Sequence, residues 1–190
     1  MPVGQCATWC STASRTRAAG SWRCTTPAHD GQPDRDAVTY WRGPPGDGGD
    51  PADSRRFTRV VAGVFRRFDT LRELYAETAA AVVHAGAGTA ADRCVATQGH
   101  VLSAGDLMRT LAVEATIHHL DLVVSLPALP GPSEEGLAEV RRTLDGLLGR
   151  PVPVLWDDAD YAPAATGRRP LTGAERARLG ADGAGFPLFT

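Results

Sequence analysis

Apolar residues recur at steps of three and four along three stretches of the chain, the spacing of an amphipathic helix. The first stretch begins at Ser54 and continues to about Ala85. Its apolar positions are Phe57, Val60, Val61, Val64, Phe68, Leu71, Leu74, Tyr75 and Val82. This pattern predicts one long helix with a buried face, ended by the glycines between Gly86 and Thr89, and then a short connection up to Gly99 that contains Cys94.

Two further helices are predicted downstream, each with recognisable ends. The sequence S-A-G-D at Ser103 offers an N-terminal capping hydroxyl with an acidic group three residues later, so a helix is expected from Ser103 to about Ser125. The prolines of Leu126–Pro132 interrupt it, and Ser133 caps a third helix that ends before Gly149. The apolar stripe of this third helix consists of Leu137, Val140, Leu144 and Leu147. Three amphipathic helices with short links indicate an antiparallel bundle.

The two ends of the chain show weaker patterns. No helical or strand period is sustained from Met1 to about Trp41, and Gly43–Pro51 has the composition of a loop. Beyond the third helix, V-P-V-L-W favours an extended segment, and T-G-A-E at Thr172–Glu175 caps a short helix. We therefore expect an all-α fold in three parts: a poorly specified segment 1–53, a helical bundle 54–150, and an extended and helical tail 151–190 that packs on the bundle.

Composition narrows the range of partners. All 20 basic residues of the 190 are arginine, a bias typical of a GC-rich bacterial genome, and the formal net charge is −2. This charge argues against broad nucleic-acid binding, which requires a basic surface. No apolar run approaches the length of a membrane span, and the first residues lack the pattern of an export signal. We expect a cytoplasmic protein with a small-molecule partner, and the oligomeric state stays open.

The candidate chemistry lies in the second predicted helix, in the segment V-E-A-T-I-H-H-L-D-L. Glu114 and His118 are four residues apart and therefore project from one face, where they can share a divalent ion such as zinc. Asp121, three residues further on, is placed to orient a ring nitrogen of His118 from outside the metal's ligand shell. The spacing equally fits the more common alternative, a salt bridge on the helix face. His119 is rotated by about 100° and is expected to face elsewhere.

Four stretches together resemble a known family, the metal-binding N-terminal domain of mycothiol-dependent maleylpyruvate isomerases within the DinB-like superfamily. They are A-V-T-Y-W-R at Ala37–Arg42, A-T-Q-G-H-V-L-S-A-G-D-L at Ala96–Leu107, V-E-A-T-I-H-H-L-D-L at Val113–Leu122, and T-G-R-R-P-L-T at Thr166–Thr172. The resemblance implies a four-helix bundle, with Glu114 and His118 as ligands of a divalent metal usually assigned as zinc. It also implies mycothiol as a cofactor and thiol-dependent isomerisation or transfer on a small electrophilic substrate.

The N-terminal segment departs from this family. Family members carry the third metal ligand, a histidine, on their first helix, seven residues after a tryptophan. Here Cys6 and Trp9 fit the start of that helix, but the position seven after Trp9 is Thr16, and the sequence between them lacks an apolar face. The segment resembles a degraded or frame-shifted version of that helix.

Replacement ligands lie close by in the sequence. His29, Cys10 and Cys24 are the nearest, and with Cys6 they also fit, loosely, the spacing of a zinc knuckle. An incomplete metal site would leave a different class of function, a non-catalytic helical module for binding or interaction. Further along the chain, Arg168 and Arg169 are expected to lie in a loop, from which they could bind a carboxylate of the substrate.

Overall fold

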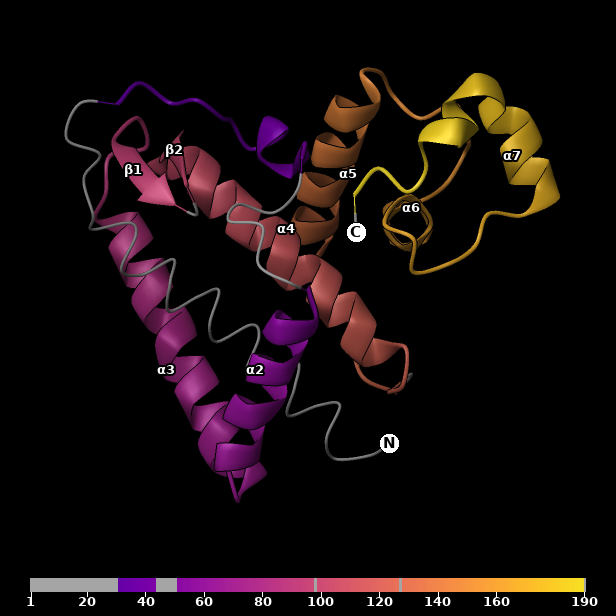
Figure 1. The fold of residues 1–190 in the computed structure, drawn as a ribbon. Helices are drawn as coiled ribbons and strands as arrows, with labels where there is room; N and C mark the ends of the chain where they lie inside the picture. Colours follow the sequence, from indigo (N-terminus) through magenta and orange to yellow (C-terminus); the bar gives the residue numbers. More distant parts are fainter. Residues whose placement is uncertain (1–30, 44–50, 98, 127, 190) are drawn as a thin grey trace. The chain divides into compact units, whose positions relative to one another are not determined.

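The computed structural model describes residues 31–43, 51–97, 99–126 and 128–189, and this part of the chain is mostly helical (Figure 1). In chain order, its elements are η1 (Thr39–Trp41), α2 (Pro51–Val64), α3 (Phe68–Ala87), β1 (Cys94–Thr97), β2 (His100–Ser103), α4 (Ala104–Val123), α5 (Glu134–Leu148), α6 (Asp158–Ala165), α7 (Gly173–Leu179) and η2 (Gly180–Gly185). The expected predominance of helix is confirmed.

The chain divides into two compact units. The first unit comprises Met1–Asp36 and Pro44–Leu111, and the second comprises Ala37–Gly43 and Ala112–Thr190. The boundary between them falls inside α4, whereas the sequence pattern placed its divisions at 53/54 and 150/151. The tail after Pro151 belongs to the same unit as α5 and the second half of α4.

The expected single helix from Ser54 to Ala85 is wrong in one respect, because two helices, α2 and α3, occupy this stretch. Between them, Arg67 has an extended backbone, with φ −122° and ψ 130°. The three residues between the helices, 65–67, include no glycine or proline, although Gly63 lies in the last turn of α2, and the apolar spacing continues from Val64 to Phe68 across the break. Periodicity alone therefore could not reveal the interruption.

The helices α4 and α5 begin where their capping residues predict, α5 ends before Gly149 as expected, and α4 ends at Val123, two residues before the expected Ser125. The Ser103 hydroxyl accepts a hydrogen bond from the backbone N–H of Asp106 (3.0 Å) and donates one to its carboxylate (2.8 Å). At α5, the Ser133 hydroxyl accepts from the backbone N–H of Gly136, and Gly149 ends the helix with φ +81°. A side-chain acceptor satisfies an otherwise unpaired N–H of the first turn, which explains why both starts could be predicted.

The expected short connection around Cys94 forms a small antiparallel hairpin in the first unit, and the sequence pattern had not predicted its two strands. Strands β1 and β2 pair with Val95 opposite Leu102, and Gly99 at the turn has φ +80°. Val95 is fully buried and packs with Ala104 and Leu107 at the start of α4. The hairpin thus covers the first turns of α4 with apolar side chains.

The core of the second unit joins the second half of α4 to α5 and α6 (Figure 1). Its buried members are Val113, Ile117, Val140, Leu144, Tyr161, Ala162 and Ala165. Helices α4 and α5 approach closely at Gly136, where an added Cβ would lie 2.6 Å from the Thr116 hydroxyl. Two residues at the ends of η1 also pack in this unit. Val38, which precedes η1, lies against Gly146 of α5, and Trp41, its last residue, stacks on Phe189 with ring centroids 4.5 Å apart.

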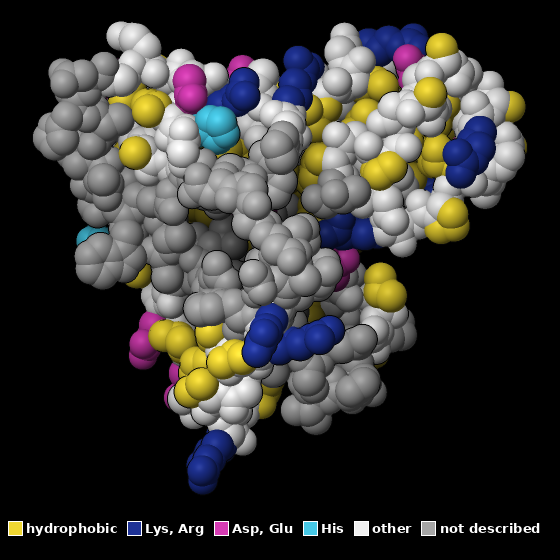
Figure 2. Space-filling model, in the orientation of Figure 1, with side chains coloured by type: hydrophobic (Ala, Val, Ile, Leu, Met, Phe, Trp, Pro, Cys, Tyr) yellow, Lys and Arg dark blue, Asp and Glu magenta, His cyan; other side chains and the backbone are white. Residues whose placement is uncertain are grey.

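Several arginines of the second unit form ion pairs with acidic side chains. Arg141 pairs with Asp158, Arg142 with Glu139, and Arg150 with Asp182. Figure 2 shows the described arginine side chains of one face as separate groups, some of them beside acidic side chains. Among the described residues, no helix is both long and apolar enough to cross a lipid bilayer.

Candidate metal site

The second half of α4 carries the three candidate residues of the sequence analysis. Val113 and Ile117 point into the core of the second unit and are almost completely buried. Glu114 and His118 each follow one of these core residues, so they lie at the margin of the core and are partly buried. The Oε2 atom of Glu114 is buried, and the His118 side chain is 25% exposed. Both sites are thus sheltered, although His118 keeps access to solvent.

His118 and Asp121 are brought together by one turn of α4. The Nδ1 atom of His118 lies 3.4 Å from the Oδ2 atom of Asp121. Residues three apart on a helix are neighbours on its surface, so the contact follows directly from the spacing. A carboxylate beside Nδ1 favours a proton on that nitrogen and leaves Nε2 with its lone pair, as in the histidines that bind metals.

Asp121 is held from its other side by Arg168, which follows α6. Arg168 Nε donates to Asp121 Oδ1 over 2.7 Å, and Nη2 donates to Oδ2 over 3.1 Å. Partial burial favours the neutral carboxyl, but the hydrogen bonds from His118 and Arg168 outweigh it and lower the pKa of Asp121 below its ordinary value. Asp121 is therefore ionised at neutral pH and carries the charge that both neighbours require.

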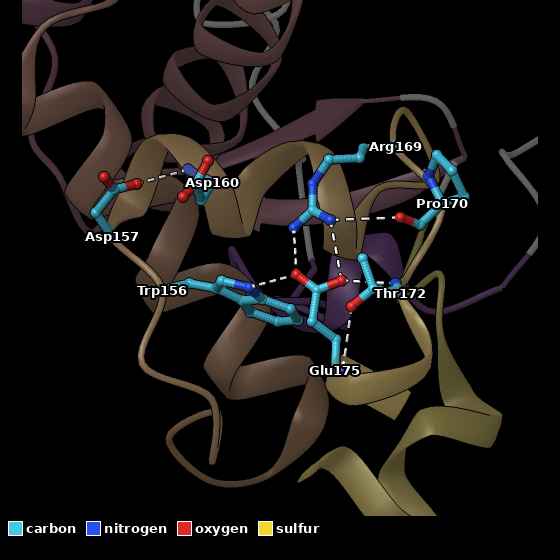
Figure 3. Close-up of polar contacts among 7 residues, drawn as sticks. All are labelled: Trp156, Asp157, Asp160, Arg169, Pro170, Thr172 and Glu175. Carbon is cyan, nitrogen blue, oxygen red and sulfur yellow. Dashed lines mark hydrogen bonds and ion pairs between the residues drawn. The ribbon is translucent and has the colours of Figure 1, made fainter. Parts of the chain in front are cut away.

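The second arginine of the loop, Arg169, is also engaged within the chain (Figure 3). Its guanidinium donates to both carboxylate oxygens of Glu175, over 2.9 Å and 3.0 Å. The expectation that Arg168 and Arg169 reach a substrate carboxylate is not supported, because both already bind carboxylates of this chain. The sequence could not indicate these partners, since Asp121 lies 47 residues before Arg168.

Two candidate ligands of a metal ion, Glu114 and His118, lie on α4. Among residues 31–43, 51–97, 99–126 and 128–189, no group of three or more His, Cys, Asp or Glu side chains is placed to hold a metal ion. The candidates for a third ligand and for the zinc knuckle, Cys6, Cys10, Cys24 and His29, lie outside the described residues, as do Trp9 and Thr16. The donor chemistry of Glu114 and His118 suits zinc, but among the described residues they are not part of a group of three or more such side chains that could hold a metal ion.

Comparisons with protein-family models, with curated proteins and with solved structures find no match for this chain. The family resemblance therefore depends on the four sequence stretches that carry it. The contact between His118 and Asp121 on α4 is a separate observation, and it concerns His118 alone among the two candidate ligands.

Proposed function

We propose that this chain is a metal-binding helical protein of the DinB-like type in which Glu114 and His118 hold one divalent ion, zinc by the nature of the donors. We further propose that it catalyses a thiol-dependent isomerisation or transfer on a small electrophilic substrate, with mycothiol as the thiol. The cofactor and the reaction class follow from the family resemblance. The choice of His118 is also supported by its contact with Asp121 on α4.

The observation that carries the proposal is the contact between His118 Nδ1 and the Asp121 carboxylate at 3.4 Å. Histidines that bind metals commonly place their second ring nitrogen against a carboxylate, which fixes the tautomer and the orientation of the ring. Asp121 is ionised and held by Arg168, so it can perform this role. Glu114, one turn before His118, then contributes a carboxylate oxygen from the same face.

The positions of these three residues suggest a separate role for each. Glu114 and His118 bind the ion, and Asp121 keeps the His118 ring in place. A bound divalent ion would lower the pKa of a coordinated thiol, so that its thiolate is available at neutral pH. The partial burial of both ligands limits competition from water at the site.

A second candidate function is a non-catalytic binding module with an incomplete metal site. It is favoured by the finding that the described residues supply no cluster of three ligands. Catalytic zinc sites usually have three protein ligands and one open position, so a two-ligand site binds weakly and supports little catalysis.

Thiol-dependent turnover of the purified chain separates the two candidates. The assay uses maleylpyruvate with mycothiol, with and without added zinc, and compares the wild-type protein with His118→Ala. The neighbouring His119→Ala serves as the matched control, because it removes an imidazole from the same helix at a different angle. Turnover that needs both zinc and thiol and is lost only in His118→Ala supports the enzyme. A folded protein that binds zinc without any turnover supports the binding module instead.

A further inference from the structure

We infer that Arg168 is a positioning residue for His118 and acts through Asp121. The inference rests on the proposed function, because metal binding is the reason why the His118 ring must be held in one orientation. The contacts that carry the inference are observed within the chain itself. Three side chains from two distant parts of the sequence form a continuous line: His118 and Asp121 from α4, and Arg168 from the turn after α6.

The shared atom of this line is Oδ2 of Asp121. It accepts a hydrogen bond from Arg168 Nη2 at 3.1 Å and lies 3.4 Å from His118 Nδ1, while Oδ1 accepts from Arg168 Nε at 2.7 Å. Two donors on one planar guanidinium fix both the position and the plane of a carboxylate. A carboxylate held in this way presents Oδ2 to the imidazole in one orientation, which a freely rotating aspartate would not do.

Arg168 is itself held by the end of α6. Its backbone N–H donates to the carbonyl of Pro163 at 2.9 Å, and its Nη1 donates to the carbonyl of Thr166 at 3.4 Å. The turn that produces this geometry needs Gly167, whose φ of +72° is unfavourable for other residues. The arginine side chain is 27% exposed, so solvent only partly screens its ion pair with Asp121.

The consequence is a preference for one tautomer of His118. An ionised carboxylate at Nδ1 stabilises the Nδ1–H form, which leaves the lone pair on Nε2 for a ligand. Loss of Arg168 frees the Asp121 carboxylate to rotate and turn toward solvent. The Nδ1–H preference should then decrease, and the ring should sample more orientations.

Nitrogen NMR of the imidazole ring tests this directly on the metal-free full chain at about pH 8, where an ordinary histidine is neutral. The wild-type protein should show mainly the Nδ1–H tautomer of His118. Arg168→Ala and Asp121→Asn should both reduce its population, and Arg168→Lys, which keeps the charge without the planar fork, should fall between. Zinc affinity, measured by competition with a chelator, should decrease about tenfold in Arg168→Ala.

Arg169→Ala is the matched control, because it also removes an arginine that tethers the tail, yet its partner is Glu175 rather than Asp121. It should leave the tautomer and the zinc affinity unchanged. The inference is overturned if Arg168→Ala and Arg168→Lys keep the wild-type tautomer ratio while Asp121→Asn alters it. If Arg168→Ala does not fold, Arg168→Lys alone decides. A tautomer that responds to Arg168 in a protein that binds no zinc would support the positioning role and contradict the proposed function.

Discussion

The indole Nε1 of Trp156 donates a hydrogen bond of 2.9 Å to the Oε1 atom of Glu175, nineteen residues further along the chain (Figure 3). The same oxygen accepts from Arg169, and the other carboxylate oxygen accepts from the backbone N–H of Thr172 at 2.7 Å. Trp156 also stacks on the buried Tyr161, with ring centroids 5.6 Å apart. Glu175 therefore connects the start of α7 to the core of the second unit.

This connection predicts a specific sensitivity to acid. The hydrogen bonds from Arg169 and from the Thr172 backbone hold the pKa of Glu175 far below its ordinary value. Because the folded protein has the lower pKa, the stabilisation by this carboxylate is complete above the unfolded-state pKa and is lost as the pH falls below about 5. Glu175→Gln should lower the urea midpoint at pH 7 and reduce the loss of stability between pH 6 and about pH 3.

Glu77→Gln provides the matched control for this experiment, since Glu77 is an exposed glutamate on α3. It should leave the urea midpoint and its dependence on pH close to the wild-type values. Equal pH profiles for Glu175→Gln and the wild-type protein would contradict the role assigned to Glu175.

The turn before Arg168 gives a second prediction. Gly167→Ala places a Cβ 3.3 Å from Pro187 in a backbone with φ +72°, whereas Gly149→Ala meets nothing within 4 Å at φ +81°. The backbone strain should cost each variant about 1–2 kcal/mol of unfolding free energy. Gly167→Ala should lose more, because Pro187 must also move. Urea unfolding measures both, and equal losses would show that the Pro187 contact is relieved without cost.

Packing between α4 and α5 gives a third prediction. In Gly136→Ala, helix propensity should raise the free energy of unfolding by up to about 1 kcal/mol, but overlap with the Thr116 hydroxyl should lower it by more. The net change should be a loss of about 1 kcal/mol. Thr116→Ala removes the overlapping atom. In the Thr116→Ala background, Gly136→Ala should therefore lower the free energy of unfolding by less than it does in the wild-type protein. A double-mutant cycle in urea tests this, and simple additivity would rule out the steric explanation.

Local chemistry explains which elements could be predicted from the sequence. The starts of α4, α5 and α7 each depend on a hydroxyl side chain that accepts from a backbone N–H three residues later, so Ser103, Ser133 and Thr172 mark them. The break at Arg67 and the hairpin at Gly99 lack such a signal. Four-residue strands are too short for an alternating pattern to stand out beside the helical spacing around them.

In the candidate site, too, local contacts could be predicted from the sequence and tertiary contacts could not. The neighbourhood of His118 and Asp121 follows from a spacing of three residues on one helix, and the sequence was sufficient to anticipate it. The partner of Asp121 was not predictable, because Arg168 reaches α4 only through the packing of α6 in the second unit. Contacts of this kind depend on tertiary structure, and spacing carries no information about them.

Direct titration of the purified, metal-free chain with zinc, in competition with a chelator of known affinity, tests the central claim that Glu114 and His118 hold a divalent ion. We predict one equivalent of bound zinc, held more weakly than in a three-ligand catalytic site unless His29 or a cysteine contributes, lost in both Glu114→Gln and His118→Ala and unchanged in His119→Ala. Absence of binding to the wild-type protein, or binding that survives in both ligand variants, would contradict the claim.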